Sequence, residues 1–285
     1  MQTVLSIAGF DPSSGAGITA DLMVFAAHGM FGTSCITNLT IQTTVGVFET
    51  HPVADDIVRK TLECLQTDLP VAGIKIGMLS EASTVEVVAE FVENLRRTEA
   101  AIPIVLDPVL CSSSGRELLS PAGLELLKCR LLPIVNWVTP NVDELRLLSG
   151  ESVKCREDML QAVQRLRQTC PNLNVVATGG HLERPDDLLL TARGEVEWLA
   201  GQFITSRSTH GTGCAFASAL LSRLVVGNSP YDASSGAKRY VAEAIRSATV
   251  LGKGKGPLNL LWPMQTQTNQ SQSGQGAIRR IESSR

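Results

Sequence analysis

The sequence predicts an α/β fold with a central, mostly parallel sheet and helices on both faces. Short apolar runs alternate with longer amphipathic segments along most of the chain. Strands that alternate with helices form β-α-β units, because parallel neighbours need a long crossover connection. Loops rich in glycine, proline and asparagine follow several of the apolar runs. Since ligands of such folds bind beyond the carboxyl ends of the strands, these loops are the candidate functional segments.

The first two thirds of the chain carry the alternating pattern. Apolar runs predict strands at 4–8, 35–41, 74–77, 102–106, 134–138 and 173–177. Amphipathic segments predict helices at 19–28, 55–65, 83–97, 121–130 and 156–168. Ser120 stands just before the fourth of these helices and is a suitable N-cap.

The pattern changes after residue 187. Three short runs, 188–191, 196–199 and 202–206, read as antiparallel strands, and two long helices follow at 212–226 and 232–251. From residue 264 the chain is a polar, glutamine-rich sequence of low complexity, which lacks the apolar groups needed to offset the entropy of ordering. We therefore expect one domain over 1–263 and a disordered polar tail over 264–285.

Composition excludes several classes of function. The 285 residues are 44% hydrophobic with a formal net charge of -3, so no basic surplus points to nucleic acid or to an anionic membrane. No apolar run approaches the roughly 20 residues of a membrane span, and the N-terminal apolar run lacks the preceding basic residues of a signal peptide. Seven dispersed cysteines, none in a Cys-x-x-Cys pair, indicate reduced thiols in a cytoplasmic protein.

The first candidate loop, 8–18, joins the first strand to the first helix and is rich in glycine and serine. Its glycines permit a ligand to approach the backbone closely, although a flexible turn explains them equally well. It is not a Walker A loop, because no Gly-Lys-Ser/Thr occurs at the required spacing.

The second candidate is a pair of segments, 107–109 and 139–144, that follow two strands expected to be neighbours. The carboxylates of Asp107 and Glu144 are suitable ligands for Mg²⁺ at this edge of the sheet. Asn141 and Glu144 also fit a helix capping box, and for these residues alone capping is the better interpretation.

The third candidate, 209–214, places Gly211, Thr212, Gly213 and Cys214 at the start of an apolar helix. Free backbone N–H groups and the helix dipole would form an anion hole there. A thiol in the first turn of a helix tends to have a lowered pKa. Close packing of the helix on the sheet is the alternative explanation of the glycines.

These three loops, in this order, resemble those of the hydroxymethylpyrimidine and phosphomethylpyrimidine kinases of the ribokinase superfamily. The similarity extends from about residue 4 to residue 263 and rests on matched motifs: Ala8-Gly9-Phe10-Asp11-Pro12 with Gly15-Ala16-Gly17-Ile18-Thr19-Ala20-Asp21, Lys75-Ile76-Gly77-Met78-Leu79, Asp107-Pro108-Val109, Thr139-Pro140-Asn141, Gly179-Gly180-His181 and Thr209-His210-Gly211-Thr212-Gly213-Cys214. The resemblance implies a ribokinase-like fold. It also implies an ATP- and Mg²⁺-dependent kinase that phosphorylates hydroxymethylpyrimidine, the precursor of thiamine, or the monophosphate of that pyrimidine, or both.

The resemblance also implies roles for individual residues. The pyrimidine pocket would be formed by Gly9, Asp21, Gln42 and Val109, with Asp21 and Gln42 as hydrogen-bonding partners of the ring. Asp107 and Glu144 would hold the metal. The nucleotide would contact Asn141, Thr178, Gly180 and His181. Cys214 stands where related sugar kinases have an aspartate base, so its thiolate would accept the proton of the substrate hydroxyl.

Two departures from the family pattern concern phosphate charge. Many members have a lysine where this chain has Thr178 and another where it has Ser113. Because these lysines are absent, the sequence does not determine the affinity for ATP or the rate of phosphoryl transfer. Their absence also motivates one alternative, a non-catalytic pyrimidine-binding protein. The other alternative is a pyridoxal or pyridoxine kinase, whose substrate is a flat heteroaromatic alcohol of similar size. Homodimers are common in such families, and the sequence leaves the oligomeric state open.

Overall fold

The computed structural model describes residues 1–99, 101–112, 115–180 and 182–265, and within these ranges it confirms the predicted α/β architecture. A nine-stranded sheet has the order β3-β2-β1-β4-β5-β6-β7-β8-β9. The strands are β1 Thr3–Phe10, β2 Phe31–Thr43, β3 Gly46–Pro52, β4 Gly73–Ile76, β5 Ile104–Leu106, β6 Trp137–Val138, β7 Asn174–Ala177, β8 Asp187–Leu190 and β9 Val196–Leu199.

The central strands β2, β1, β4, β5, β6 and β7 pair in parallel. At the two edges β3, β8 and β9 pair antiparallel. The chain moves from β1 outward to β2 and then returns to β4 on the other side of β1. Such a reversal of strand order opens a crevice at the carboxyl ends of the strands, which is where ligands of α/β folds bind.

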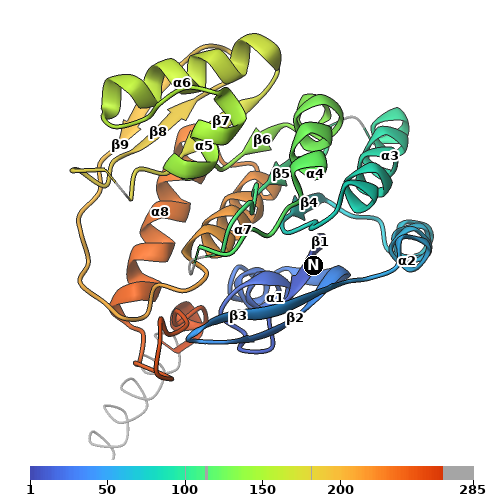
Figure 1. The fold of residues 1–285 in the computed structure, drawn as a ribbon, viewed down its shortest axis with the longest axis horizontal. Helices are drawn as coiled ribbons and strands as arrows, with labels where there is room; N and C mark the ends of the chain where they lie inside the picture. Colours follow the sequence, from blue (N-terminus) through green and yellow to red (C-terminus); the bar gives the residue numbers. More distant parts are fainter. Residues whose placement is uncertain (100, 113–114, 181, 266–285) are drawn as a thin grey trace, which may run out of the picture.

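Helices cover both faces of the sheet (Figure 1). The helical segments are α1 Gly17–Ala27, α2 Asp55–Asp68, α3 Ala82–Thr98, α4 Pro121–Leu126, η1 Leu127–Leu131, η2 Leu132–Ile134, α5 Val142–Ser149, α6 Arg156–Thr169, α7 Thr212–Val225 and α8 Pro230–Arg246. One apolar cluster packs α2 to α6 against the sheet, and a second packs α1, α7 and α8 against its other face. The domain thus has three layers, with the sheet between two layers of helices.

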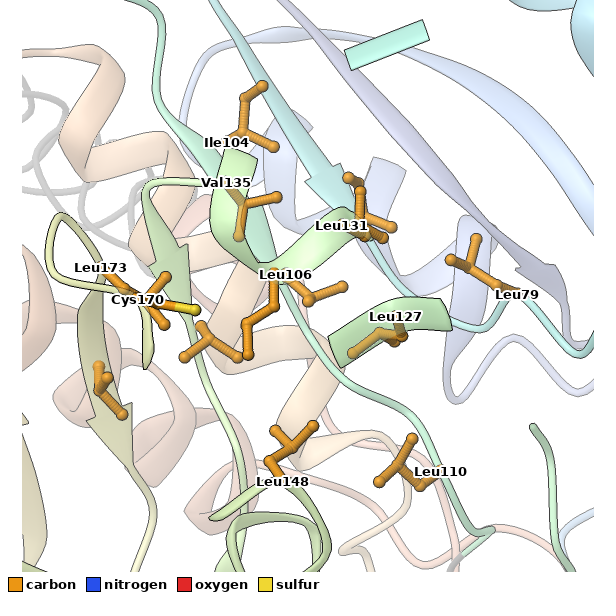
Figure 2. Packing of buried hydrophobic residues seen from close by; sticks show 14 of the residues in the cluster. Leu79, Ile104, Leu106, Leu110, Leu127, Leu131, Val135, Leu148, Cys170 and Leu173 are labelled. Atoms are coloured by element: carbon orange, nitrogen blue, oxygen red, sulfur yellow. The ribbon is translucent and has the colours of Figure 1, made fainter. Parts of the chain in front are cut away.

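The first cluster fixes two segments that carry predicted site residues. Figure 2 shows Leu106 of β5 in this cluster together with Leu127 and Leu148, the last from α5. Leu106 is fully buried, and the next residue, Asp107, emerges at the carboxyl end of β5. Burial of these leucines therefore anchors both the strand that ends at Asp107 and the helix that carries Glu144.

Most predicted elements are present, with boundaries shifted by a few residues. Ser120 caps α4 as predicted, since its side chain accepts a hydrogen bond from the backbone N–H of Gly123. The predicted strand over 134–138 is reduced to β6, because η2 with its proline occupies the preceding residues. The predicted helix over 121–130 changes at residue 127 from α4 into the wider turn η1.

Four features differ more strongly from the prediction. The predicted strand over 202–206 does not form; these residues follow the edge strand β9, and all of them except Thr205 line a cavity. The helix predicted to reach residue 251 ends at Arg246, ahead of β-branched Thr249 and Val250 and of Gly252, whose φ is positive. The sequence interpretation missed β3, which forms a hairpin with β2, and it noted the capping box of α5 without the helix itself.

The predicted boundary at residue 264 falls inside a short helical turn. The N–H groups of Met264 and Gln265 both donate to the carbonyl of Leu261, and Asn259 Nδ2 donates to Gln265 Oε1. The folded part therefore extends at least to Gln265. Residues 266–285 lie outside the described residues, so the disordered tail stays a prediction. Each described helix is too short or too polar to cross a bilayer.

Candidate active site

A cavity of about 2050 Å³ lies at the carboxyl ends of the central strands. With two exceptions the predicted site residues line it: Gly9, Gln42, Asp107, Val109, Asn141, Glu144, Thr178, Gly180, Gly211, Thr212, Gly213 and Cys214. One exception is Asp21, which is fully buried away from the cavity. The other is His181, which lies outside the described residues. The fold therefore gathers almost all of the predicted residues in one place.

Asp11 organises the first loop. One carboxylate oxygen accepts hydrogen bonds from the N–H and hydroxyl of Ser13, at 2.8 and 2.7 Å. The other accepts from the N–H of Ala16 at 3.0 Å and lies 2.8 Å from Nε2 of His210. Burial acts to raise the pKa of Asp11, but the hydrogen bonds of His210 and Ser13 outweigh it, so the pKa is lowered. The ionised carboxylate of Asp11 thus stabilises the conformation of this loop through hydrogen bonds.

Gln42, on β2, lies beside the same histidine. Its Nε2 is 2.9 Å from Nε2 of His210, and its Oε1 accepts from the Thr40 hydroxyl at 3.3 Å. When His210 Nε2 carries the hydrogen that it donates to Asp11, it has no lone pair left for the Gln42 amide. The amide N–H then lacks a good acceptor among the residues that the structure describes and is available to a ligand.

The third loop supplies a helix N-terminus, as predicted. Gly211 has φ 82° and precedes the first turn of α7. A Cβ at Gly211 would collide with the carbonyl oxygen of Gly15, so the first and third loops touch through backbone that only glycine permits. The N–H groups of the first turn have no acceptor within the helix, so they can bind an anion.

Asp107 and Glu144 both line the cavity. The capping box predicted for α5 is present: Asn141 Oδ1 accepts from the N–H of Asp143 and Glu144, and Glu144 Oε2 accepts from the N–H of Asn141. Burial raises the pKa of Glu144 to about 8, and the charge of Asp107 adds to the effect. Asp107 Oδ2 is buried and has no hydrogen-bond partner in the described part of the chain. Two close carboxylates that resist ionisation together favour a cation between them.

The structure contradicts the predicted contact between Asp21 and the pyrimidine. Its carboxylate is fully buried under the cavity, where it accepts hydrogen bonds from the hydroxyls of Ser6 at 2.6 Å and Ser218 at 2.8 Å and from Lys75 Nζ at 3.0 Å. Asp21 lies near the start of α1, and its side chain points toward the sheet rather than toward the loop 8–18. Asp21 is therefore the partner of a buried lysine and does not face the ligand.

The buried position of Cys214 disfavours the predicted thiolate, which stays a prediction. Burial raises the pKa of the thiol above its ordinary value, and the charge of Lys75 offsets this only in part. The nearby carboxylates of Asp107 and Asp21 raise the pKa further. The helix N-terminus alone would have lowered it, but desolvation by the surrounding protein is the larger effect.

Sequence reasoning missed three residues of the site. Asp11, Lys75 and His210 were part of the matched motifs but were given no role. A lysine inside the short apolar strand Gly73–Ile76 was the available signal, because such a strand is buried on both faces and a lysine there needs a charged partner.

Basic side chains of α8 line the cavity. Lys238 lines the cavity and pairs with Asp187 at 2.7 Å, and Asp187 also accepts from the N–H of Gly179. This salt bridge lies beside Thr178, one of the two positions that lack the expected lysine. Ser113, the other, lies outside the described residues.

Comparison with known proteins agrees with this geometry. The model of the phosphomethylpyrimidine kinase family matches residues 11–259. The chain belongs to this family. A hydroxymethylpyrimidine/phosphomethylpyrimidine kinase of Aquifex aeolicus is 39% identical over 252 residues, which cover 88% of this chain and 96% of the relative. A relative of the same name from Haemophilus influenzae is 36% identical over 264 residues, 91% of this chain and 96% of the relative.

Solved structures of family members and of pyridoxal kinases share the fold. The crystal structure of a phosphomethylpyrimidine kinase from Clostridium difficile has a TM-score of 0.74 at 34% identity and covers 86% of this chain and 100% of that one. The pyridoxal kinase of Staphylococcus aureus in complex with ADP has a TM-score of 0.82 at 29% identity, covering 92% and 94%. The family member and its structural relatives are thus ribokinase-like kinases, which confirms the fold and the enzyme class implied by the sequence motifs.

Proposed function

We propose that this kinase transfers the terminal phosphoryl group of ATP to hydroxymethylpyrimidine, to its monophosphate, or to both. The observation that carries the proposal is one cavity that Gln42, Asp107 and the N-terminus of α7 line together. A substrate bound beside Gln42 would share this cavity with the anion hole. Phosphoryl transfer requires that the substrate hydroxyl and the transferred phosphoryl group meet in one site.

The substrate end fits a flat heteroaromatic ring. Gly9, Gln42 and Val109 line it together with Met78, whose Sδ would be 3.0 Å from a Cβ at Gly9. A side chain at position 9 would therefore fill the space available to the ring. The amide of Gln42 offers both a donor and an acceptor, which match a ring nitrogen and an exocyclic amino group.

The phosphoryl end contains Gly211, Thr212, Gly213 and Cys214. Their backbone N–H groups stabilise the charge on the transferred phosphoryl group, with the dipole of α7 adding to the field. Cys214 accepts the proton of the substrate hydroxyl. Because burial disfavours the thiolate in the ligand-free protein, this role requires that the thiol ionise once the substrates are bound, and Lys75 is the charge that favours the thiolate.

The carboxylates of Asp107 and Glu144 fit a magnesium ion. Asp107 Oδ2 is buried without a hydrogen bond, and Glu144 lies close enough for the two charges to oppose each other. No third protein ligand completes a cluster among the described residues. Mg²⁺ commonly takes one or two carboxylates and fills its remaining positions with water and phosphate oxygens, so this pair suffices. The ion would neutralise phosphate charge.

The nucleotide end takes ATP. Asn141, Thr178 and Gly180 line it, and we include His181 in the contacts. Lys238 is a basic side chain near Thr178, where many family members have a lysine of their own, but Asp187 balances its charge. The presence of Asp107, Glu144 and Cys214 in the cavity favours a catalytic kinase over a non-catalytic binding protein.

A pyridoxal kinase is the second candidate, because the pyridoxal kinases of Staphylococcus aureus match the fold with TM-scores of 0.80 to 0.82. The higher sequence identity to the pyrimidine kinases supports the first candidate. The two substrates differ by the hydrogen bonds that Gln42 can make with them, which is the kind of difference a pocket discriminates.

The deciding experiment is steady-state turnover with ATP and Mg²⁺, with hydroxymethylpyrimidine, its monophosphate and pyridoxal as separate acceptors. We expect kcat/KM for a pyrimidine to exceed that for pyridoxal, and mass spectrometry of the products to show which phosphorylation occurs. A higher value for pyridoxal would make the second candidate correct. Binding of the pyrimidine without consumption of ATP would identify a non-catalytic protein.

A homodimer and a cytoplasmic location stay predictions. None of the seven cysteines forms a disulfide, which supports the second. Size-exclusion chromatography with light scattering tests the first.

A further inference from the structure

Lys75 is a fully buried lysine directly beneath the cavity. It lies on β4, the central strand between β1 and β5, and has 0% of its surface exposed. Its Nζ is 3.0 Å from Asp21 Oδ2 and 3.6 Å from Asp107 Oδ2. A Cβ at Gly77 would come within 2.8 Å of Nζ, so the neighbouring glycine leaves the ammonium group its space. A buried ammonium is costly unless it is paired, so its place under the site calls for an explanation.

Asp21 holds this lysine in one position. Its two oxygens accept hydrogen bonds from Ser6 on β1 and Ser218 on α7, in addition to Lys75. The carboxylate is thus fixed by a strand on one side and by the helix of the anion hole on the other. Asp21, whose Oδ2 lies 3.0 Å from Nζ, is the counter-ion of this buried ammonium group.

The same ammonium stands next to the proposed metal ligand. It approaches Asp107 Oδ2 without a hydrogen bond, and that oxygen has no other partner among the described residues. Asp107 Oδ1 faces α7, since a Cβ at Gly213 would lie 3.7 Å from it. A cation bound at Asp107 would therefore lie near the charge of Lys75, and the two positive charges would repel each other.

We propose that Lys75, held by Asp21, is a positioning residue that fixes the carboxylate of Asp107 and weakens its affinity for a free divalent cation. The cation then binds well only when it arrives with the phosphates of the nucleotide, whose negative charge outweighs the repulsion. Lys75 thereby couples metal binding to nucleotide binding. The proposal rests on the proposed function, because it concerns the metal and nucleotide of that site.

The test measures Mn²⁺ binding by calorimetry with and without a non-hydrolysable ATP analogue. Lys75→Met should bind free Mn²⁺ about tenfold more tightly than the wild type, because a charge near the ligand is gone. Its kcat should fall tenfold or more, because Asp107 loses its orientation and Cys214 loses the charge that favours its thiolate. A variant that is merely damaged would lose activity and bind the cation more weakly, so the opposite signs of the two effects distinguish a positioning role. Asp107→Asn in the Lys75→Met background should abolish the gain in Mn²⁺ affinity.

Two further variants keep the test decisive. Asp21→Asn/Lys75→Met removes both buried charges while its amide still pairs with Ser6 and Ser218, so it serves if Lys75→Met does not fold. Lys60→Met is the matched control, because Lys60 is 72% exposed on α2 and should change neither quantity. Equal Mn²⁺ affinity in the wild type and in the folded variants overturns the role of Lys75. Absence of Mn²⁺ binding in every protein, even with the ATP analogue, rejects the metal site of the proposed function and this proposal with it.

Discussion

Asp11 and His210 are 199 positions apart in the sequence, yet Oδ2 of the aspartate and Nε2 of the histidine lie 2.8 Å apart at the cavity wall. The contact ties the loop after β1 to the loop before α7. Since Gln42 on β2 also reaches His210 Nε2, one imidazole links the proposed substrate pocket to the proposed anion hole. Substitutions on either side of this link should affect substrate use in distinguishable ways.

Gln42→Leu should raise the Michaelis constant for the pyrimidine about tenfold or more. Polar ring atoms left unpaired in a pocket cost roughly 1–3 kcal/mol each. The affinity for ATP should change little, because Gln42 is not among the residues proposed to contact the nucleotide. Gln66→Leu on the exposed face of α2 is the control. Unchanged steady-state constants for the pyrimidine would exclude Gln42 from substrate recognition.

Glu144→Gln should make the metal-free protein less sensitive to pH. The folded-state pKa of Glu144 is about 8 and its ordinary value is 4.5, so between these values the folded state holds a proton that the unfolded state has lost. The contribution of Glu144 to stability therefore falls as pH rises through this window. Glutamine cannot titrate but still accepts the hydrogen bond of Asn141.

The measurement is the melting temperature of both proteins with a chelator, from pH 5 to pH 8. The variant should gain stability relative to the wild type as pH rises. A difference that stays constant over this range would show that Glu144 is ionised in the folded protein despite its burial and the charges of Asp107 and Asp143.

Gly211→Ala and Gly213→Ala should fail in different ways. Gly211 has φ 82°, and a Cβ there collides with the Gly15 carbonyl, so the variant should lose melting temperature as well as turnover. The left-handed conformation alone costs an alanine about 1–2 kcal/mol. A Cβ at Gly213 meets only Asp107 Oδ1 at 3.7 Å, so that variant should keep its melting temperature and lose turnover by crowding the phosphoryl group. Comparable melting temperatures for the two variants would contradict this assignment of roles.

Cys214→Ser should bind ATP and the pyrimidine normally and turn over slowly. A positioned general base contributes about 10²–10⁴-fold to the rate. Because the thiol pKa is raised, the wild-type kcat should increase with pH above neutrality, whereas the serine variant should lack this increase. Calorimetric affinities, kcat and melting temperature are to be measured on the same preparation. Near wild-type turnover at saturating substrate would leave the loop as an anion hole without a base.

Removal of the residues after Gln265 should leave activity and melting temperature unchanged. The polar, glutamine-rich composition of 266–285 offers little apolar surface for packing. Gln265 itself is kept because it accepts a hydrogen bond from Asn259. A melting temperature several degrees lower in the shortened protein would show that the tail packs on the domain.

Local patterns in the sequence were sufficient for much of the fold. The alternation of apolar runs and amphipathic segments predicted the parallel sheet, and the Ser120 and Asn141 caps were readable because capping depends on residues within one turn. The hairpin strand β3 was missed, since its residues are largely exposed and carry no clear apolar alternation. The predicted strand over 202–206 failed because a strand needs a pairing partner, which no local pattern supplies.

The sequence by itself determined the order of the functional loops. Its motifs also identified the family and most of the residues that line the cavity. Only the tertiary structure decided what Asp21 and Cys214 do there. Asp21 reads as an early-helix acid, but the packing of β1, β4 and α7 buries it against Lys75. Cys214 reads as a thiolate at a helix N-terminus, but the surrounding protein desolvates it and raises its pKa. Burial and charge pairing depend on residues far apart in the chain, so they are properties of the assembled site rather than of any local pattern.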